Sequence, residues 1–228
     1  MTVLELRALR FAWPGSTRRL LHIDQLQLGA GERLLLRGPS GGGKSTLLSI
    51  AAGVLVASSG EARLLGVDWR TLSAGQRDRR RADAIGVVFQ QFNLLPYLSV
   101  LDNVLLAGRF SATRLQRAGP RPRETAQALL AALELEPSSW PRPAAQLSVG
   151  QQQRVAAARA LFGRPSLVIA DEPTSALDEA RRDAFMALLL RECAAAGSAL
   201  LFVSHDARLA RHFERVVELD VLNQAVAA

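Results

Sequence analysis

Short apolar runs, in places alternating with polar residues, occur along the first ninety positions of the chain, with breaks at glycine and proline. The alternation over residues 2–28, interrupted by Pro14-Gly15, predicts two antiparallel strands joined by a turn. The other elements expected in this part are a strand over residues 32–37, a helix over 44–52, a strand over 60–65, a basic helix over 71–83 and a buried strand over 85–89.

The pattern changes after residue 90, where helical spacing replaces the short alternating runs. Residues 99–135 read as helical with an interruption at 118–122, and the proline-flanked residues 137–143 predict a stiff connector. A helix from about 150 to 163 is followed by strand, helix, strand, short helix and strand, the alternation typical of a parallel sheet.

These elements predict an α/β fold with a mostly parallel sheet in its core, an N-terminal antiparallel β subdomain and an inserted α-helical subdomain. The expected organisation is a single domain over residues 1–228. Within it, residues 1–90 and 161–228 would form the core, and residues 91–160 the helical subdomain.

Composition adds a preference for an anionic partner. The formal net charge is +7, which suits a nucleotide, a nucleic acid or an anionic membrane surface. Two arginine clusters, within residues 77–81 and 114–123, are most simply solvated faces, with a lipid or nucleic-acid patch as the alternative. The single Cys193 excludes an internal disulfide and suggests a small buried side chain. The sequence offers no apolar run long enough to span a membrane and no secretory signal, so a cytoplasmic location is expected.

One stretch fits a phosphate-binding pattern at every specified position, G-x-x-x-x-G-K-[ST]. In such a loop glycine lets the backbone approach anionic oxygens, the following helix start offers free amides, and Lys44 offers its charge to the terminal phosphates. The Ser45 hydroxyl would bind Mg²⁺. The alternative is a glycine-rich turn that happens to end in Lys-Ser. The candidate nucleotide-binding residues of this loop are Gly38, Pro39, Ser40, Gly41, Gly42, Gly43, Lys44, Ser45 and Thr46. With this loop, the expected fold is a P-loop NTPase, and residues 1–90 with 161–228 are its expected nucleotide-binding core.

A second apolar strand is expected over residues 167–170, and two carboxylates follow it directly. This is the form of a Walker B element, in which Asp171 would hold Mg²⁺ and Glu172 would take a proton from an attacking water. Taken alone, the stretch could also be a strand that ends in a solvated acidic turn.

A second helix start of the same chemical type lies at residues 147–154. Ser148 is expected to be the N-cap, leaving the amides of Gly150 and Gln151 available to an anion. A P-loop needs no second phosphate site. The P-loop, Leu-Ser-x-Gly-Gln and Asp-Glu-Pro-Thr-Ser-Ala-Leu-Asp, in this order and spacing, resemble the ATP-binding cassette family over nearly the whole chain.

The resemblance implies further roles at positions that match family motifs. Gln90 looks like the glutamine that touches the Mg²⁺ and water site, and Asp178 resembles the loop that crosses between two cassettes. His205 resembles the switch histidine that contacts the γ-phosphate, whereas His22 and His212 match no motif. Trp13 looks like the aromatic residue that stacks on adenine, and Phe11 is the second candidate for this role.

Two positions depart from the family pattern. Val149 stands where the signature more often has glycine, and its β-branched side chain could restrict how closely a phosphate approaches. Gly42 stands where the family often has serine, and the missing side chain should have little effect.

The resemblance also implies partners. Two copies would pair head to tail around ATP and Mg²⁺, with an integral membrane permease contacted near residues 90–96 through Phe92, Leu94 and Leu95, and no nucleic acid is expected. The protein would then sit in the cytoplasm, peripheral on the inner face of the membrane. Residues 89–104 are similar to the lipoprotein-release and macrolide-efflux branch; an amino-acid-type importer, a cell-division cassette and a soluble non-transport cassette remain alternatives.

Overall fold

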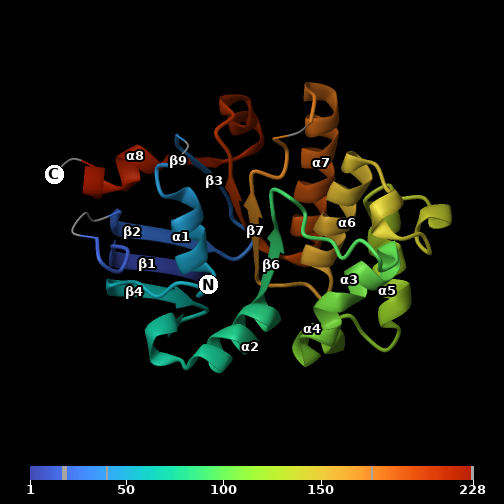
Figure 1. Ribbon diagram of the computed structural model, residues 1–228, viewed down its shortest axis with the longest axis horizontal. Helices are drawn as coiled ribbons and strands as arrows, with labels where there is room; N and C mark the ends of the chain where they lie inside the picture. Colours follow the sequence, from blue (N-terminus) through green and yellow to red (C-terminus); the bar gives the residue numbers. More distant parts are fainter. Residues whose placement is uncertain (17–19, 40, 176, 227–228) are drawn as a thin grey trace. The chain divides into compact units, whose positions relative to one another are not determined.

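The computed structural model describes residues 1–16, 20–39, 41–175 and 177–226. The chain divides into two compact units, residues 1–81 with 199–228, and residues 82–198. Each unit combines strands with helices (Figure 1).

An antiparallel sheet begins the first unit. Its four strands lie in the order β2-β1-β4-β5. Their alternation buries one face: Leu4, Leu6 and Leu9 of β1 are almost inaccessible to solvent, and Leu6 lies opposite Leu26 and Ala62. The bounds are β1 Thr2–Phe11, β2 Leu21–Gly29, β4 Ser59–Leu64 and β5 Val67–Asp68.

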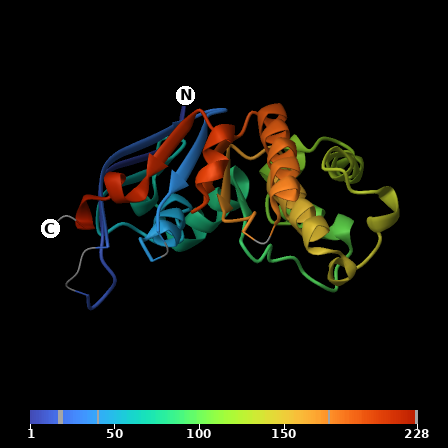
Figure 2. The same ribbon diagram turned by 90° about the horizontal axis from the view of Figure 1, so that it is seen from above.

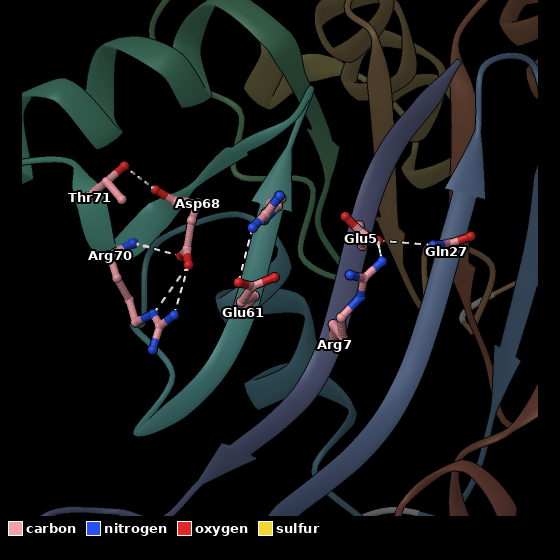
Figure 3. A network of polar contacts seen from close by, with 8 residues as sticks. Glu5, Arg7, Gln27, Glu61, Asp68, Arg70 and Thr71 are labelled. Atoms are coloured by element: carbon pink, nitrogen blue, oxygen red, sulfur yellow. Dashed lines mark hydrogen bonds and ion pairs between the residues drawn. The ribbon is translucent and has the colours of Figure 1, made fainter.

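The polar face of this sheet carries opposite charges on neighbouring strands (Figure 3). Glu5 of β1 lies opposite Gln27 and Arg63, and Arg7 lies opposite Glu61. Such cross-strand pairs favour the observed register. The ion pairs on this face run along single strands, Glu5 with Arg7 and Glu61 with Arg63, and Gln27 donates across the strands to Glu5 at 2.9 Å.

The first unit also contains a group of parallel strands. β3 (Arg33–Arg37) pairs with β8 (Ala199–Val203) on one side and with β9 (Arg215–Glu218) on the other. Residues 34–36 are fully buried, as the apolar run predicts. The helical elements of this part are α1 Lys44–Ala51, the 3₁₀ turn Trp69–Thr71, α2 Ala74–Ala84, the 3₁₀ turn Ala207–His212, α8 Leu219–Leu222 and the 3₁₀ turn Gln224–Val226.

Helix α2 begins three residues later than the sequence pattern predicts. The expected start at Thr71 is occupied by a 3₁₀ turn, in which the carboxylate of Asp68 accepts a hydrogen bond from the amide of Arg70. Burial raises the pKa of Asp68, but its hydrogen bonds and ion pair with Arg70 outweigh burial, and the net shift is downward.

The second unit combines two parallel strands with a group of helices. β6 (Ile85–Val88) pairs with β7 (Leu167–Asp171). Helix α6 packs against α3, α5, α7 and β6, and Figure 2 shows α6 and α7 side by side. The helices are α3 Val100–Arg109, α4 Ala112–Arg117, α5 Pro122–Ala132, α6 Val149–Leu161 and α7 Glu179–Ala196, with 3₁₀ turns at Pro137–Ser139 and Ala144–Gln146.

Small side chains allow the centre of this unit to pack closely. Residues 155–158 of α6 are all buried, and three of the four are alanine. A Cβ atom at Gly86 of β6 would lie 2.0 Å from the carbonyl oxygen of Ala160, so only glycine fits there. The predicted helical stretch over 99–135 also breaks at Ser111, whose hydroxyl caps α4 by accepting from the amide of Arg114.

One expectation about surface charge is wrong. Arg114 is 4% exposed, and its guanidinium donates to the carbonyl oxygens of Phe162 (2.7 Å), Ala160 (2.5 Å), Arg159 (3.1 Å) and Ile85 (3.3 Å). Burial lowers its pKa to about 10. Arg114 is therefore an interior residue, and its guanidinium donates hydrogen bonds to carbonyl oxygens at the carboxyl end of α6.

Cys193 is buried in α7, as expected. None of the helices in the described part of the chain combines the length and the apolar character that a membrane span requires.

Candidate functional site

The glycine-rich loop joins β3 to α1 in the first unit. Gly43, the N-cap of α1, has φ +95°, a conformation that residues with a side chain rarely adopt. Lys44 is 7% exposed, and its ammonium donates to the carbonyl oxygens of Gly38 (2.8 Å) and Pro39 (3.0 Å). The loop thus folds around its own lysine. Ser40, a predicted contact, lies outside the described residues.

The start of α1 provides a positive end for an anion. Its first turn has no acidic side chain, and Ser45 is exposed while Thr46 is half-buried. The amides of a helix start and the helix dipole together attract phosphate groups. The lysine, the glycines and the helix start therefore fit a polyphosphate, as the sequence motif predicts.

His205 follows β8 at the same edge of the parallel strands. Leu36 pairs with Val203, so Gly38 and His205 each stand two residues beyond a matched pair. The carboxyl ends of neighbouring parallel strands face one way, and ligands of α/β folds bind there. His205 is exposed in this position.

The two aromatic candidates at the end of β1 differ in accessibility. Trp13 is 48% exposed, whereas Phe11 is buried at 5% and meets the Trp13 ring edge to face at a centroid distance of 5.2 Å. A buried ring cannot stack on a base, so Phe11 is not a second candidate for the contact with adenine. Trp13 stays the predicted contact for adenine.

In the second unit, the Walker B strand ends as the sequence predicts. β7 ends at Asp171, and Glu172 has φ +45°, an unusual conformation for a residue with a side chain. The carbonyl oxygen of Glu172 accepts from the amide of Ser175 at 3.2 Å. Glu172 itself is half-buried. A carboxylate held at a strand end in this way is suited to orient or deprotonate a water molecule.

The start of α6 carries a complete capping box. The Ser148 hydroxyl accepts from the amide of Gln151 at 3.3 Å, and the Gln151 side chain accepts from the amide of Ser148 at 3.0 Å. The expectation that the Gln151 amide is left for an anion is therefore wrong, because Ser148 occupies it. Val149 is 51% exposed at the first position of the helix.

A cavity of about 600 Å³ opens beside this helix start. Its walls are formed by the first turns of α6, by the loop after β7 and by α7. Its lining residues are Ser148, Val149, Gly150, Gln151, Gln153, Arg154, Leu177, Arg181 and Phe185.

Asp178 has a structural partner. Its carboxylate caps α7 by accepting from the amide of Arg181 at 2.9 Å, and it forms an ion pair with the Arg181 guanidinium at 3.3 Å. A capping aspartate is a common reason for this residue type at a helix start. Its predicted role between two cassettes stays a prediction.

The loop after Gln90 is tied to two helices. Phe92 and Asn93 have φ +58° and +49°, and the guanidinium of Arg159 donates to both carbonyl oxygens, at 2.5 and 2.6 Å. Burial lowers the pKa of Arg159. The Asn103 side chain accepts from the amide of Leu95 at 2.8 Å and donates to its carbonyl oxygen at 3.0 Å.

The expected docking surface of this loop is wrong at Phe92. Phe92 is 8% exposed, so it belongs to the interior and cannot form part of a docking surface. Tyr97 is 74% exposed, and Leu94 and Leu95 are half-buried. Gln90, two residues after the end of β6, is exposed.

Sequence reasoning missed three buried or half-buried polar residues that support these segments, namely Asn103, Gln153 and Arg159. Gln153 falls on the buried face of α6 together with Ala156, Ala157 and Ala160, so helical spacing could have singled it out. Its partner, the carbonyl oxygen of Pro173, has no sequence signal.

Comparisons with known proteins agree with this geometry. The family described as ABC transporter matches residues 21–175. The lipoprotein-releasing system ATP-binding protein LolD of Novosphingobium aromaticivorans is 42% identical over 220 residues, covering 95% of this chain and 96% of that protein. The macrolide export protein MacB of Chromobacterium violaceum is 41% identical over 194 residues, 85% of this chain and 29% of its own length.

A solved structure is similar over nearly the whole chain. It is the dimeric post-hydrolysis state of the ATP-binding cassette MJ0796 bound to ADP and Pi, with a TM-score of 0.81 and 34% identity, covering 97% of this chain and 95% of that one. Because the family match covers residues 21–175 and the LolD relative is similar over nearly its whole length, the chain belongs to the ABC transporter family as an ATP-binding cassette.

Proposed function

We propose that the chain is the ATP-hydrolysing subunit of an export or mechanotransmission transporter, of the kind named by its LolD and MacB relatives, and that it powers a separate membrane permease. The observation that carries the proposal is that one chain has two helix starts of a kind suited to an anion, one after the lysine-closed loop at Lys44 and one capped by Ser148. The match to LolD over 96% of that protein supports the branch.

In this proposal the glycine-rich loop binds the triphosphate. The Lys44 ammonium turns from the loop carbonyls to the terminal phosphates, and the indole of Trp13 stacks on adenine. Oxygen donors suit Mg²⁺, and the Ser45 hydroxyl, the Asp171 carboxylate and the Gln90 side chain are the residues that would hold it. Bound Mg²⁺ would neutralise charge that develops on the phosphate oxygens.

Glu172 acts as the general base. Its carboxylate takes a proton from a water molecule, whose oxygen attacks the γ-phosphorus while the bond to the β-phosphate oxygen breaks, giving ADP and phosphate. His205 donates to the γ-phosphate from the end of β8. The positive φ of Glu172 supports this role, because unusual backbone conformations gather at active sites.

A second copy completes each site. Ser148 and Gly150 of one chain would face the triphosphate held by the loop of the other, with the Asp178 segments between the two copies. The dimeric form of the MJ0796 relative supports this arrangement. The core, residues 1–90 with 161–228, would hold nucleotide, and residues 91–160 would carry the signature helix.

The membrane partner is proposed to contact the loop after Gln90, at Tyr97 and the accessible parts of Leu94 and Leu95. Contact with an integral permease would place the protein on the inner face of the membrane. Opening and closing of the pair would then reach the permease through this loop.

The test is a Glu172→Gln variant compared with the parent and with Glu136→Gln, an exposed carboxylate elsewhere in the same unit. We expect Glu172→Gln to bind ATP, to lose turnover and to form a dimer with saturating ATP and Mg²⁺ in size-exclusion chromatography. Parental turnover would remove Glu172 as base, and a monomer at saturating nucleotide would contradict the paired site. Failure to recover any integral membrane protein from native membranes would contradict the transporter assignment.

A further inference from the structure

Gln153 is an amide-bearing side chain in the interior of the second unit. It lies one turn into α6 and is 1% exposed. Its Nε2 donates to the carbonyl oxygen of Pro173 at 2.9 Å, across 20 positions of sequence. A buried amide is retained at low cost only where it finds a partner, and here that partner is the residue after Glu172.

The segment it holds has an unusual backbone. Glu172 has φ +45°, and the turn closes through the bond from the Ser175 amide to the Glu172 carbonyl oxygen. Left-handed backbone in a residue with a side chain persists only when its surroundings hold it in place. Pro173 has no amide hydrogen, so its carbonyl oxygen is the main-chain polar atom through which a neighbour can hold this residue.

Gln153 also lines the cavity of about 600 Å³ beside the start of α6. Gln153 therefore borders the cavity at the start of α6 and bonds to the turn that carries the carboxylate. Both contacts lie within the same unit of the chain.

We propose that Gln153 is a positioning residue for Glu172, fixing the Glu172-Pro173 turn against α6 so that the carboxylate is held where it can take the proton from water. The inference rests on the proposed role of Glu172 as general base. It assigns Gln153 no contact with nucleotide, so its removal should change the rate of the chemical step and leave ATP binding intact.

The test replaces the amide by an apolar chain of similar size, Gln153→Met. Gln152→Met is the matched control, because the neighbouring Gln152 side-chain amide donates to the carbonyl oxygen of Leu147, and Gln152 is not one of the residues that line the cavity. We expect kcat to fall roughly tenfold or more in Gln153→Met, as for misplaced catalytic groups, with KM for ATP unchanged. Gln152→Met should keep the parental kcat.

A double variant separates positioning from general damage. In single-turnover hydrolysis of radiolabelled ATP, Gln153→Met should lower the rate of the parent but not the residual rate of Glu172→Gln, because the group it positions is already disabled. An equal loss in both backgrounds, or a parental kcat in Gln153→Met, would overturn the proposal. A Glu172→Gln variant with full turnover would instead remove the proposed base itself.

Should Gln153→Met fail to fold, Gln153→Asn offers a second route. Its amide is one methylene shorter and cannot span the 2.9 Å contact from the same backbone position. The same loss of kcat at unchanged KM supports the proposal, and an unchanged kcat overturns it.

Discussion

The ammonium of Lys44 lies 2.8 Å from the carbonyl oxygen of Gly38, at the opposite end of the same loop. The loop is thereby closed by its own side chain. A triphosphate that took the ammonium would exchange these carbonyl contacts for phosphate oxygens, which carry full charge and bind ammonium more strongly.

Lys44→Ala should weaken ATP binding roughly 10- to 100-fold, the size expected when a hydrogen bond to a charged group is lost. Calorimetry of the parent and the variant measures the change. Lys44 is the only lysine in the chain, so its side-chain amine can also be labelled selectively against the α-amino group. Labelling that ATP does not slow would contradict a phosphate contact.

The Arg159 guanidinium fixes the backbone after Gln90 through the carbonyl oxygens of Phe92 and Asn93. Arg159→Leu removes both bonds, and we expect faster amide hydrogen exchange over residues 90–96. The reason is that Phe92 and Asn93 have positive φ, a conformation that needs support from surrounding residues. Exchange within α3 should stay slow.

Arg154→Leu is the matched control for this prediction. Arg154 lies on the same helix and donates to the carbonyl oxygen of Glu134 at 3.1 Å, away from the Gln90 loop. Equal exchange rates over residues 90–96 in the parent and Arg159→Leu would show that the loop is held by other contacts.

The sequence predicts features that depend on neighbouring residues, but not contacts between residues far apart in the chain. Glycine at the P-loop, apolar residues in β3 and β7, and Ser148 before α6 act locally, and local patterns identified each of them. Composition and the family resemblance predict Arg114 and Phe92 at the surface, yet both are buried. Both also bond to residues distant in the sequence, Arg114 to Phe162 and Phe92 to Arg159. No pattern within residues 149–161 specifies that Gln153 meets Pro173, since that contact exists only after β7 has packed.

Arg114 is expected to matter for stability. Arg114→Met would leave the carbonyl oxygens of Ala160 and Phe162 without their donor inside the protein, and unsatisfied buried groups cost about 1–3 kcal/mol each. Chemical denaturation should therefore show a loss of roughly 3 kcal/mol. The control, Arg117→Met, changes an exposed arginine on the same helix that bonds to Arg164 at 3.3 Å, and it should lie close to the parent. Similar losses in both variants would contradict an interior role for Arg114.

Glu32 joins two segments of the first unit through its carboxylate. It accepts from the amide of Gly29 and pairs with the Arg215 guanidinium, both at 2.7 Å. Burial raises the pKa of Glu32, but the Gly29 and Arg215 contacts outweigh burial and the net shift is below the ordinary value of 4.5. A carboxylate with a lowered folded pKa stabilises the protein above its unfolded pKa, and this contribution disappears as pH falls through the folded value.

Glu32→Gln should accordingly be less stable than the parent at neutral pH, and the difference should shrink once the pH drops below about 4.5, where the unfolded carboxyl becomes protonated. Denaturation midpoints measured across this range give the difference at each pH. Glu214→Gln is the control, because Glu214 is 83% exposed and lies 3.7 Å from Arg33. A Glu32→Gln difference that stays constant as the solution is acidified would mean that the carboxylate charge does not contribute, and that any loss comes from packing alone.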